Sequence, residues 1–210
     1  MAGLDRKKKN LFKGGEKELR NKLLTLIVVL ILASPIFAWT DGNLAVNGDM
    51  SMDWDKNGLP DYWSINWIFA TSPNKAVMDK DENIDGNASL KIEVSSLDVP
   101  NNFAGRAYQD IPVEPGKTYE VSVWMKIEDW QLPQGQEEGG VNISYWLQGT
   151  NKQWTERKDL TRPLTGTFDW REIKATITIP AKTQAFRLAL FAYPGTGTIW
   201  FDNVKMIEAK

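Results

Sequence analysis

The sequence contains no cysteine and no histidine. Without cysteine the protein has no disulfide, no thiolate nucleophile and no cysteine-based zinc site. Without histidine, Ser-His-Asp and Cys-His catalysis are excluded, together with every metal site built on imidazole. A bound metal ion must therefore be held by oxygen ligands, which points to calcium or magnesium.

The sequence also lacks an apolar run long enough to cross a bilayer. Its longest run, LLTLIVVLILA at Leu23–Ala33, has 11 residues, whereas a spanning helix needs roughly 20. Several lysines precede this run, and SPIFA follows it and ends in the small residue Ala38. Because this order is typical of a secretory signal peptide, we predict that residues 1–38 are a signal peptide cleaved near Ala38. An uncleaved anchor is the alternative, because most residues from 23 to 39 are apolar.

Basic residues are scarce outside the N-terminal segment. Residues 1–38 hold 8 of the 25 basic and 3 of the 27 acidic residues, so the remainder has 17 basic and 24 acidic residues and a net charge of −7. This balance leaves no basic patch for nucleic acid and favours a neutral or cationic partner. We predict one domain, residues 39–210, that is not associated with a membrane and is exported in the bacterial manner to the medium or the cell surface.

Helical periodicity is missing from Asn43 onward. Short stretches instead alternate apolar and polar residues and are separated by Pro, Gly, Asn and Asp, which predicts β-strands joined by turns. The clearest are SLKIEV (89–94), TYEVSVWMKI (118–127), VNISYWLQ (141–148), REIKATITIP (171–180), AFRLALFAY (185–193) and TIWFDNVKMIE (198–208). Because each has one apolar face, we predict an all-β fold, a two-sheet antiparallel β-sandwich.

The stretch DWDKNGLPDYW at Asp53–Trp63 has the spacing of a calcium-binding loop. Counted from Asp53, the first nine residues follow an EF-hand pattern. Side-chain oxygen ligands stand at Asp53, Asp55, Asn57 and Asp61, and the required glycine is Gly58. The last position is Ser64, which offers no bidentate carboxylate, and the flanks are not helical. A calcium switch is therefore unsupported. Two interpretations remain open: a structural calcium site, or Asp and Asn turns around Asn57–Gly58.

Ten tryptophans exceed what core packing usually needs. A flat indole stacks well on the C–H face of a sugar ring, at little cost in side-chain entropy. Three of the tryptophans are interpreted as core or rim residues: Trp63, Trp170 and Trp200. The alternation within the predicted strands places other side chains on outward faces, where apolar groups indicate an interaction surface. These are Trp124, Ser144, Trp146, Gln148, Arg187, Phe191 and Tyr193.

Several motifs between Asn43 and Glu208 occur in the order of one known family. They are NLAVNGDM, NGLPDYW, GNASLKI, QDIPVEPGKTYEVSVWMK, TFDWREI and IWFDNVKMIE. The chain thus resembles the carbohydrate-binding modules of the β-jelly-roll superfamily, nearest to family sixteen, with relatives in families four, nine and twenty-two. The resemblance implies a jelly roll that binds a polysaccharide or oligosaccharide and is not an enzyme.

The resemblance also implies a structural calcium ion near the junction of the first and last strands. Asp202 matches the family's calcium aspartate, and the stretch from Asn47 to Asp49 matches its N-terminal half. Relatives often carry a glutamate where this sequence has Ser51. Either Asp49 compensates for this difference or the site is weakened.

The sugar site implied by the resemblance is a concave sheet with an aromatic platform at each end. One platform matches Trp67, or else Trp63, and the other matches Phe191. Polar positions between them match Ser144 and Glu156, and the outward Trp146, Gln148 and Trp124 complete the candidate set. The implied ligands are plant-type β-linked chains of the glucan or mannan class. The implied partner is a glycoside hydrolase, to which such modules are usually fused.

Two other functions compete with this interpretation. The first is a surface adhesion or assembly protein whose aromatic face binds protein, which a glycan-binding assay would separate from a sugar-binding module. The second is a glycoside hydrolase that uses two carboxylates. Candidate carboxylates exist, but nothing in the sequence marks any two of them as a pair. They are Glu120, Glu128, Glu156 and Asp159.

Overall fold

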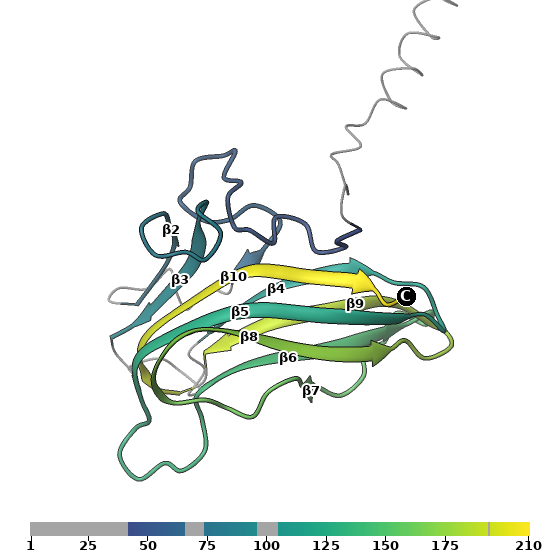
Figure 1. Ribbon diagram of the computed structural model, residues 1–210. Coiled ribbons are helices and arrows are strands. Elements are labelled where there is room, and N and C mark those ends of the chain that lie inside the picture. Colours follow the sequence, from purple (N-terminus) through teal and green to yellow (C-terminus); the bar gives the residue numbers. More distant parts are fainter. Residues whose placement is uncertain (1–41, 66–73, 96–104, 193) are drawn as a thin grey trace, which may run out of the picture. The chain divides into compact units, whose positions relative to one another are not determined.

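The computed structural model describes residues 42–65, 74–95, 105–192 and 194–210 (Figure 1). The predicted signal peptide and its cleavage point, Trp67 and Tyr193 lie outside the described residues. The described elements are all β-strands, arranged in two antiparallel five-stranded sheets. The predicted all-β sandwich is thereby confirmed. Within the described ranges, no helix has the length and apolar character needed to cross a membrane.

Sheet A has the strand order β2-β3-β10-β5-β8. Its strands are β2 (Lys75–Asp79), β3 (Ser89–Val94), β10 (Thr196–Glu208), β5 (Thr118–Gln131) and β8 (Gly166–Thr178). The C-terminal strand β10 thus lies in the middle of the sheet, paired with β3 on one side and β5 on the other (Figure 1).

Sheet B has the strand order β1-β4-β9-β6-β7. Its strands are β1 (Ser64–Ile65), β4 (Gly105–Pro112), β9 (Thr183–Ala192), β6 (Val141–Gly149) and β7 (Lys158–Asp159). The central strand β9 pairs with β4 and β6 over nearly its whole length. These three strands form most of the outer face of sheet B.

One hydrophobic core is shared by the two sheets. The alternating apolar positions predicted from the sequence supply it: Leu90 and Ile92 from β3, Val121, Val123, Met125 and Ile127 from β5, Ile143 and Leu147 from β6, and Phe186, Leu188 and Leu190 from β9. All of them are buried. Because consecutive strand residues point to opposite sides, the side chains between them lie on the two outer faces of the sandwich.

Strand β4 did not stand out in the sequence because a glutamine occupies one of its inward positions. Gln109 is 7% exposed. Its side chain accepts a hydrogen bond from the Val46 N–H and donates to the carbonyls of Val46 and Tyr62. A buried amide fixed in this way joins the N-terminal loop to sheet B.

The N-terminal segment is held against β10 by backbone contacts. Leu44 N–H donates to the Met206 carbonyl, and Val204 N–H donates to the Gly48 carbonyl, each at 2.8 Å. Asn43 adds side-chain hydrogen bonds to Val204 and Met206. A Cβ atom at Gly48 would collide with the Val204 carbonyl oxygen. The close approach therefore depends on glycine.

Candidate functional site

The outer face of sheet B gathers aromatic and charged side chains from three adjacent strands. We call it the Trp146 face. The strand register aligns its residues in rows across β4, β9 and β6. The rows are Arg106–Phe191–Asn142, Tyr108–Ala189–Ser144 and Asp110–Arg187–Trp146, and Gln148 follows on β6.

Trp146 and Phe191 form the aromatic centre of the face. Their ring centroids are 5.8 Å apart and their planes are inclined by 43°. Trp146 is half-buried, whereas Phe191 is 1% exposed. The expectation that Phe191 offers a free stacking platform is corrected here, because Trp146, Arg106 and Arg157 lie against its ring. Phe191 instead supports the side chains above it.

Two arginines lie among the rings. The Arg106 Cζ atom is 5.0 Å from the Tyr108 centroid and 5.6 Å from that of Trp146. The Arg187 Cζ atom lies 4.4 Å from Tyr108 and 4.3 Å from Trp154. Each guanidinium therefore lies against at least two aromatic side chains, an arrangement that cation–π attraction favours.

Arg187 is also paired with a carboxylate. Its Nε and terminal nitrogen donate to the two oxygens of Asp110 at 2.6 and 2.8 Å. This hydrogen bonding to Asp110 raises the pKa of Arg187 above its ordinary value. The fork-to-fork geometry fixes both side chains and orients the guanidinium between its two rings.

At the β6–β7 edge, a second carboxylate is held by two donors. Ser144 Oγ donates to Asp159 at 2.6 Å, and Arg157 Nε lies 3.0 Å from Asp159. Ser144 is completely buried, so its hydroxyl serves this contact. Arg157 also reaches over Phe191, with its Cζ atom 5.7 Å from the ring centroid.

The other predicted sugar-site residues have different locations. Gln148 is half-exposed at the end of β6, where its Oε1 accepts a hydrogen bond from Gln184 at 3.0 Å. Glu156 is exposed in the loop between β6 and β7. Trp124 belongs to sheet A, opposite Glu172 of β8. The structure thus brings Trp146, Ser144, Gln148 and Phe191 onto one face and places Trp124 on the other sheet.

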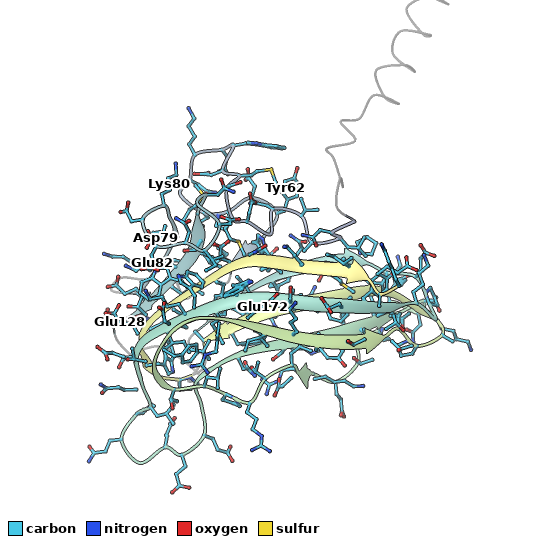
Figure 2. All side chains as sticks on the ribbon, in the orientation of Figure 1. Tyr62, Asp79, Lys80, Glu82, Glu128 and Glu172 are labelled. Atoms are coloured by element: carbon cyan, nitrogen blue, oxygen red, sulfur yellow. The ribbon has the colours of Figure 1, made fainter. Side chains whose placement is uncertain are left out.

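Two of the tryptophans interpreted as core or rim residues anchor a loop to the outer face of sheet A. Trp200 Nε1 donates to Asp79 at 2.9 Å, and Trp170 Nε1 donates to Glu82 at 2.8 Å. Asp79 and Glu82 flank the turn that follows β2 (Figure 2). Burial acts to raise the pKa of Asp79, but hydrogen bonds from Trp200 and two backbone N–H groups lower it below its ordinary value. These tryptophans have a structural role.

Trp63 is the remaining member of that group, and it does lie in the core. It is 6% exposed, and its Nε1 donates to the Asn47 carbonyl at 3.1 Å. Asn47 in turn bonds through its side chain to the backbone of Met52 and Asp61. Trp63 is therefore a packing residue at the root of the Asp53–Trp63 loop.

The Asp53–Trp63 loop is organised by its own hydrogen bonds. Asp53 accepts from the N–H groups of Asn57 and Gly58, and Asp55 accepts from Asn57. Asp61 accepts from the N–H of Trp54 at 2.6 Å. This is the hydrogen bonding expected of Asx turns. Trp54 and Tyr62 are exposed on the loop, with ring centroids 5.8 Å apart. Figure 2 shows Tyr62 in this loop.

Asp202 differs from the other described carboxyl groups in its burial. It is completely buried on β10. Burial raises its pKa to about 7, and the nearby charges of Asp85 and Asp49 act in the same direction, against hydrogen bonds from Ile84 and Asn203. A cation at this place would compensate the buried charge. Among the described residues, no three acidic side chains come together as a metal site.

A family model described as a carbohydrate binding domain matches residues 61–196. The chain belongs to this carbohydrate-binding family. The matched region contains β4, β6 and β9 and therefore the whole Trp146 face. No curated protein sequence matches the chain.

Solved structures share the fold at low sequence identity. The enzymatically active domain of bacteriophage CBA120 tailspike protein 4 matches 80% of this chain and 22% of its own, with a TM-score of 0.58 and 14% identity. The CBM22-1–GH10 modules of Clostridium thermocellum xylanase 10B, complexed with xylohexaose, match 81% of this chain and 29% of their own, with a TM-score of 0.55 and 14% identity. The chain thus spans roughly a quarter of each of these proteins.

A third structure matches over its entire length. It is described as Family 16 Carbohydrate Binding Module-2, and 79% of this chain aligns with 100% of it, at a TM-score of 0.51 and 19% identity. The identities show a common fold. The family named from the sequence motifs agrees with both the family model and this structure.

Sequence reasoning missed several residues of the Trp146 face, among them Arg106, Tyr108 and Trp154. The first two alternate with Ala107 and Ile111 in GRAYQDI, a pattern that the buried Gln109 hides. Trp154 lies outside the regular strands, and an isolated bridge to Gln148 brings it to the face. No periodic pattern marks a residue in such a position.

Proposed function

We propose that the domain binds a β-linked polysaccharide of the glucan or mannan class through the Trp146 face and does not cleave it. The proposal rests mainly on one observation: half-buried aromatic rings lie on the outside of a sheet whose other side is a complete core. Trp146, Tyr108 and Trp154 occupy this position. A sugar ring can cover such a surface with its C–H face while its hydroxyls meet neighbouring polar groups.

The polar side chains of the face suit the rim of a sugar ring. Arg187 and Asp110 hold one another at fixed positions between Tyr108 and Trp154. Gln148 and Gln184 form a second ordered pair at the end of β6. Groups whose rotamers are already fixed lose little entropy when a ligand binds, which favours affinity.

The hydrogen-bonded pairing of the carboxylates on this face supports a non-catalytic role. Asp110 is paired with Arg187, and Asp159 accepts hydrogen bonds from Ser144 and Arg157. Glycoside hydrolysis needs one carboxyl group that carries a proton and a second one across the bond to be cleaved. The side chains of Asp110 and Asp159 are instead engaged by arginine and serine. Of the other candidates, Glu120 and Glu128 lie on sheet A.

Calcium is proposed as a structural ligand beside β10, held by Asp202 and Asp49. Asp202 is completely buried with the charges of Asp85 and Asp49 nearby, and Ser51 Oγ donates to Asp49 at 2.8 Å, which fixes that carboxylate. Bound calcium would supply positive charge, and backbone carbonyls or water would complete its coordination. The Asp53–Trp63 loop is the second candidate, although its carboxylates already accept hydrogen bonds from the loop.

We also propose export to the cell surface or medium and association with a glycoside hydrolase. The export proposal rests on the basic, apolar and small-residue order of residues 1–38. The partner proposal rests on the family, since a structurally similar chain joins such a module to a GH10 module. Sequencing the N-terminus of secreted protein tests the first, with Trp39 or a nearby residue as the expected start.

The binding proposal is tested by two tryptophan substitutions on opposite sheets. Affinity electrophoresis against cellulose, mannan, xylan and β-glucan first identifies a ligand, and calorimetric titration with its hexasaccharide follows. Trp146→Ala should weaken binding about thirtyfold, since a central interface aromatic contributes roughly 2 kcal/mol or more. Trp124→Ala removes an identical side chain from sheet A and should leave the affinity unchanged.

The pair of variants separates the possible outcomes. Loss of affinity in Trp124→Ala with none in Trp146→Ala would place the binding face on sheet A. No retention on any of the four polysaccharides, together with capture of a protein partner that Trp146→Ala abolishes, would favour the adhesion function. Thermal melts of both variants check that each has folded.

A further inference from the structure

Among the described residues, Arg106 forms no salt bridge with a carboxylate, although the charge of Asp110 lies near it. It is half-buried on β4, in the row that contains Phe191 and Asn142. Its buried Nε has no hydrogen-bond partner within the described ranges. Burial, followed by the charge of Arg187, lowers the pKa of Arg106 below its ordinary value. A cation in this position is stabilised mainly by the aromatic rings beside it.

The other two arginines of this surface are already paired. Arg187 binds Asp110, and Arg157 binds Asp159. The three arginines and two aspartates leave one positive charge in excess, and Arg106 is the unpaired member within the described part of the chain. The surface therefore has a local positive charge, although residues 39–210 carry a net charge of −7.

Asn142, in the same row, also has side-chain polar atoms without hydrogen-bond partners in the described structure. It is completely buried, and this applies to both polar atoms of its side chain. Buried polar atoms are nearly always satisfied by protein, water or ligand. Arg106 and Asn142 flank Phe191 from the neighbouring strands β4 and β6. Unsatisfied donors thus lie on both sides of one aromatic ring.

We propose that the Trp146 face recognises an acidic glycan whose sugar rings carry carboxylates, and that Arg106 binds one of them. This inference rests on the proposed function and adds the charge of the ligand to it. A guanidinium offers parallel N–H donors that match the two oxygens of a carboxylate. Tyr108 and Trp146, at 5.0 and 5.6 Å from the Arg106 Cζ atom, are placed to contact the ring that bears the carboxylate.

Another role for Arg106 would be packing alone. Its guanidinium covers the rings of Tyr108, Trp146 and Phe191, and cation–π contacts stabilise a protein without any ligand. A purely structural arginine predicts equal affinity for neutral and acidic chains of the same linkage. Comparing such chains therefore distinguishes the two roles.

The test uses ligands that differ only at the carboxyl group. Calorimetric titration compares hexamers of β-1,4-mannuronate, the methyl ester of the same hexamer, and β-1,4-mannohexaose. A parallel set uses β-1,4-glucuronate, its methyl ester and β-1,4-glucohexaose. The wild-type domain should bind one of the acids about tenfold more tightly than its ester and its neutral counterpart, as expected for one added charge-assisted pair.

Two variants assign the preference to one residue. Arg106→Gln should abolish the preference for the acid over its ester and its neutral counterpart. Arg171→Gln removes the same charge from sheet A, where Arg171 lies 3.5 Å from the centroid of Phe168, and should retain the preference. The ester comparison uses unaltered protein, so it remains decisive even if Arg106→Gln does not fold.

The outcomes separate this inference from the proposed function. Equal binding of acid, ester and neutral hexamer by the wild type would overturn the acidic ligand and leave polysaccharide binding intact. Preference for the acid that persists in a folded Arg106→Gln variant would overturn the role of Arg106. Failure of every hexamer and of all four polysaccharides to bind would reject the proposed function itself.

Discussion

Asp79 links the outer face of sheet A to the turn after β2. Its hydrogen bonds make the stability of the domain depend on pH. Trp200 Nε1 and the N–H groups of Asp81 and Glu82 all donate to its carboxylate. These bonds favour the ionised form and lower the pKa of Asp79, against the effect of burial. The stabilisation is therefore present above the unfolded-state pKa of about 4 and is lost as the pH falls through the lower folded-state value.

The substitution Trp200→Phe should reduce the change in unfolding free energy with pH. It keeps the apolar ring and deletes the donor to Asp79, so the free energy of unfolding should fall by roughly 1–2 kcal/mol at pH 6. The difference from wild type should be smaller at pH 3, below the unfolded-state pKa of about 4, because the stabilisation is lost as the pH falls toward the lowered folded-state pKa of Asp79. Urea unfolding at the two pH values measures it. An equal difference at both would show that the Asp79 contact contributes nothing, and Trp124→Phe is the matched control.

Single residues also show what an alternating pattern can and cannot predict. The pattern assigned Phe191 and Trp146 to an outward face correctly, because period-two geometry fixes the side of a sheet. It could not predict that Phe191 is covered, since the covering side chains Arg106 and Arg157 come from elsewhere in the chain. Trp124 faces outward too, but on the other sheet. Assignment to a sheet depends on long-range pairing that local sequence does not encode.

Among the structural elements, the N-terminal segment depends on Gly48. Its carbonyl accepts from Val204 N–H, and a Cβ atom there would meet the Val204 carbonyl oxygen. Backbone atoms cannot move aside as a flexible side chain can. Gly48→Ala should therefore lower the free energy of unfolding by about 2–3 kcal/mol, because the segment must shift away from β10.

Gly166 provides a control for the Gly48→Ala variant. It shows the cost of adding a methyl group where no atom is close. Gly166 has a φ of +83° and open space around its Cβ position, so Gly166→Ala should cost only the strain of a left-handed residue, about 1 kcal/mol. Chemical denaturation of both variants makes the comparison. If Gly48→Ala proves no more destabilising than Gly166→Ala, the segment is held less tightly than the structure indicates.

The strands differ in how well the sequence predicts them. The six stretches that alternate clearly correspond to β3, β5, β6, β8, β9 and β10. The two-residue strands β1 and β7 are too short to show any period, and β4 carries the buried Gln109. Their hydrogen bonds to neighbouring strands, rather than their own residues, define them. The missed part of the candidate site lies on β4 for this reason.

At the scale of the whole domain, we expect calcium to raise stability. A ligand that binds only the folded state at about 100 times its dissociation constant adds roughly 2.7 kcal/mol, or about 5–10 °C in melting temperature. Melts at pH 8 with calcium and with chelator measure the shift. Asp202→Asn should abolish it, whereas Asp53→Asn should leave it intact if the ion lies beside β10.

If Asp53→Asn abolishes the calcium-dependent shift and Asp202→Asn does not, the ion lies in the Asp53–Trp63 loop. A melting curve that chelator does not change, with no metal bound in elemental analysis, would contradict both sites. The loop would then be a set of turns held by its own hydrogen bonds. In that case the buried Asp202 should be partly protonated at neutral pH, because burial raises its pKa to about 7.

The position of β10 sets the order in which the domain can form. Thr196–Glu208 fills the space between β3 and β5, so before it is added these two strands have no neighbour on that side. Until this strand has been synthesised, sheet A consists of two separate parts, β2-β3 and β5-β8. We therefore expect the complete core to form only after β10 is available, through contacts between distant segments that form slowly. If residues 1–38 direct export, this delay keeps the chain unfolded while it is threaded across the membrane.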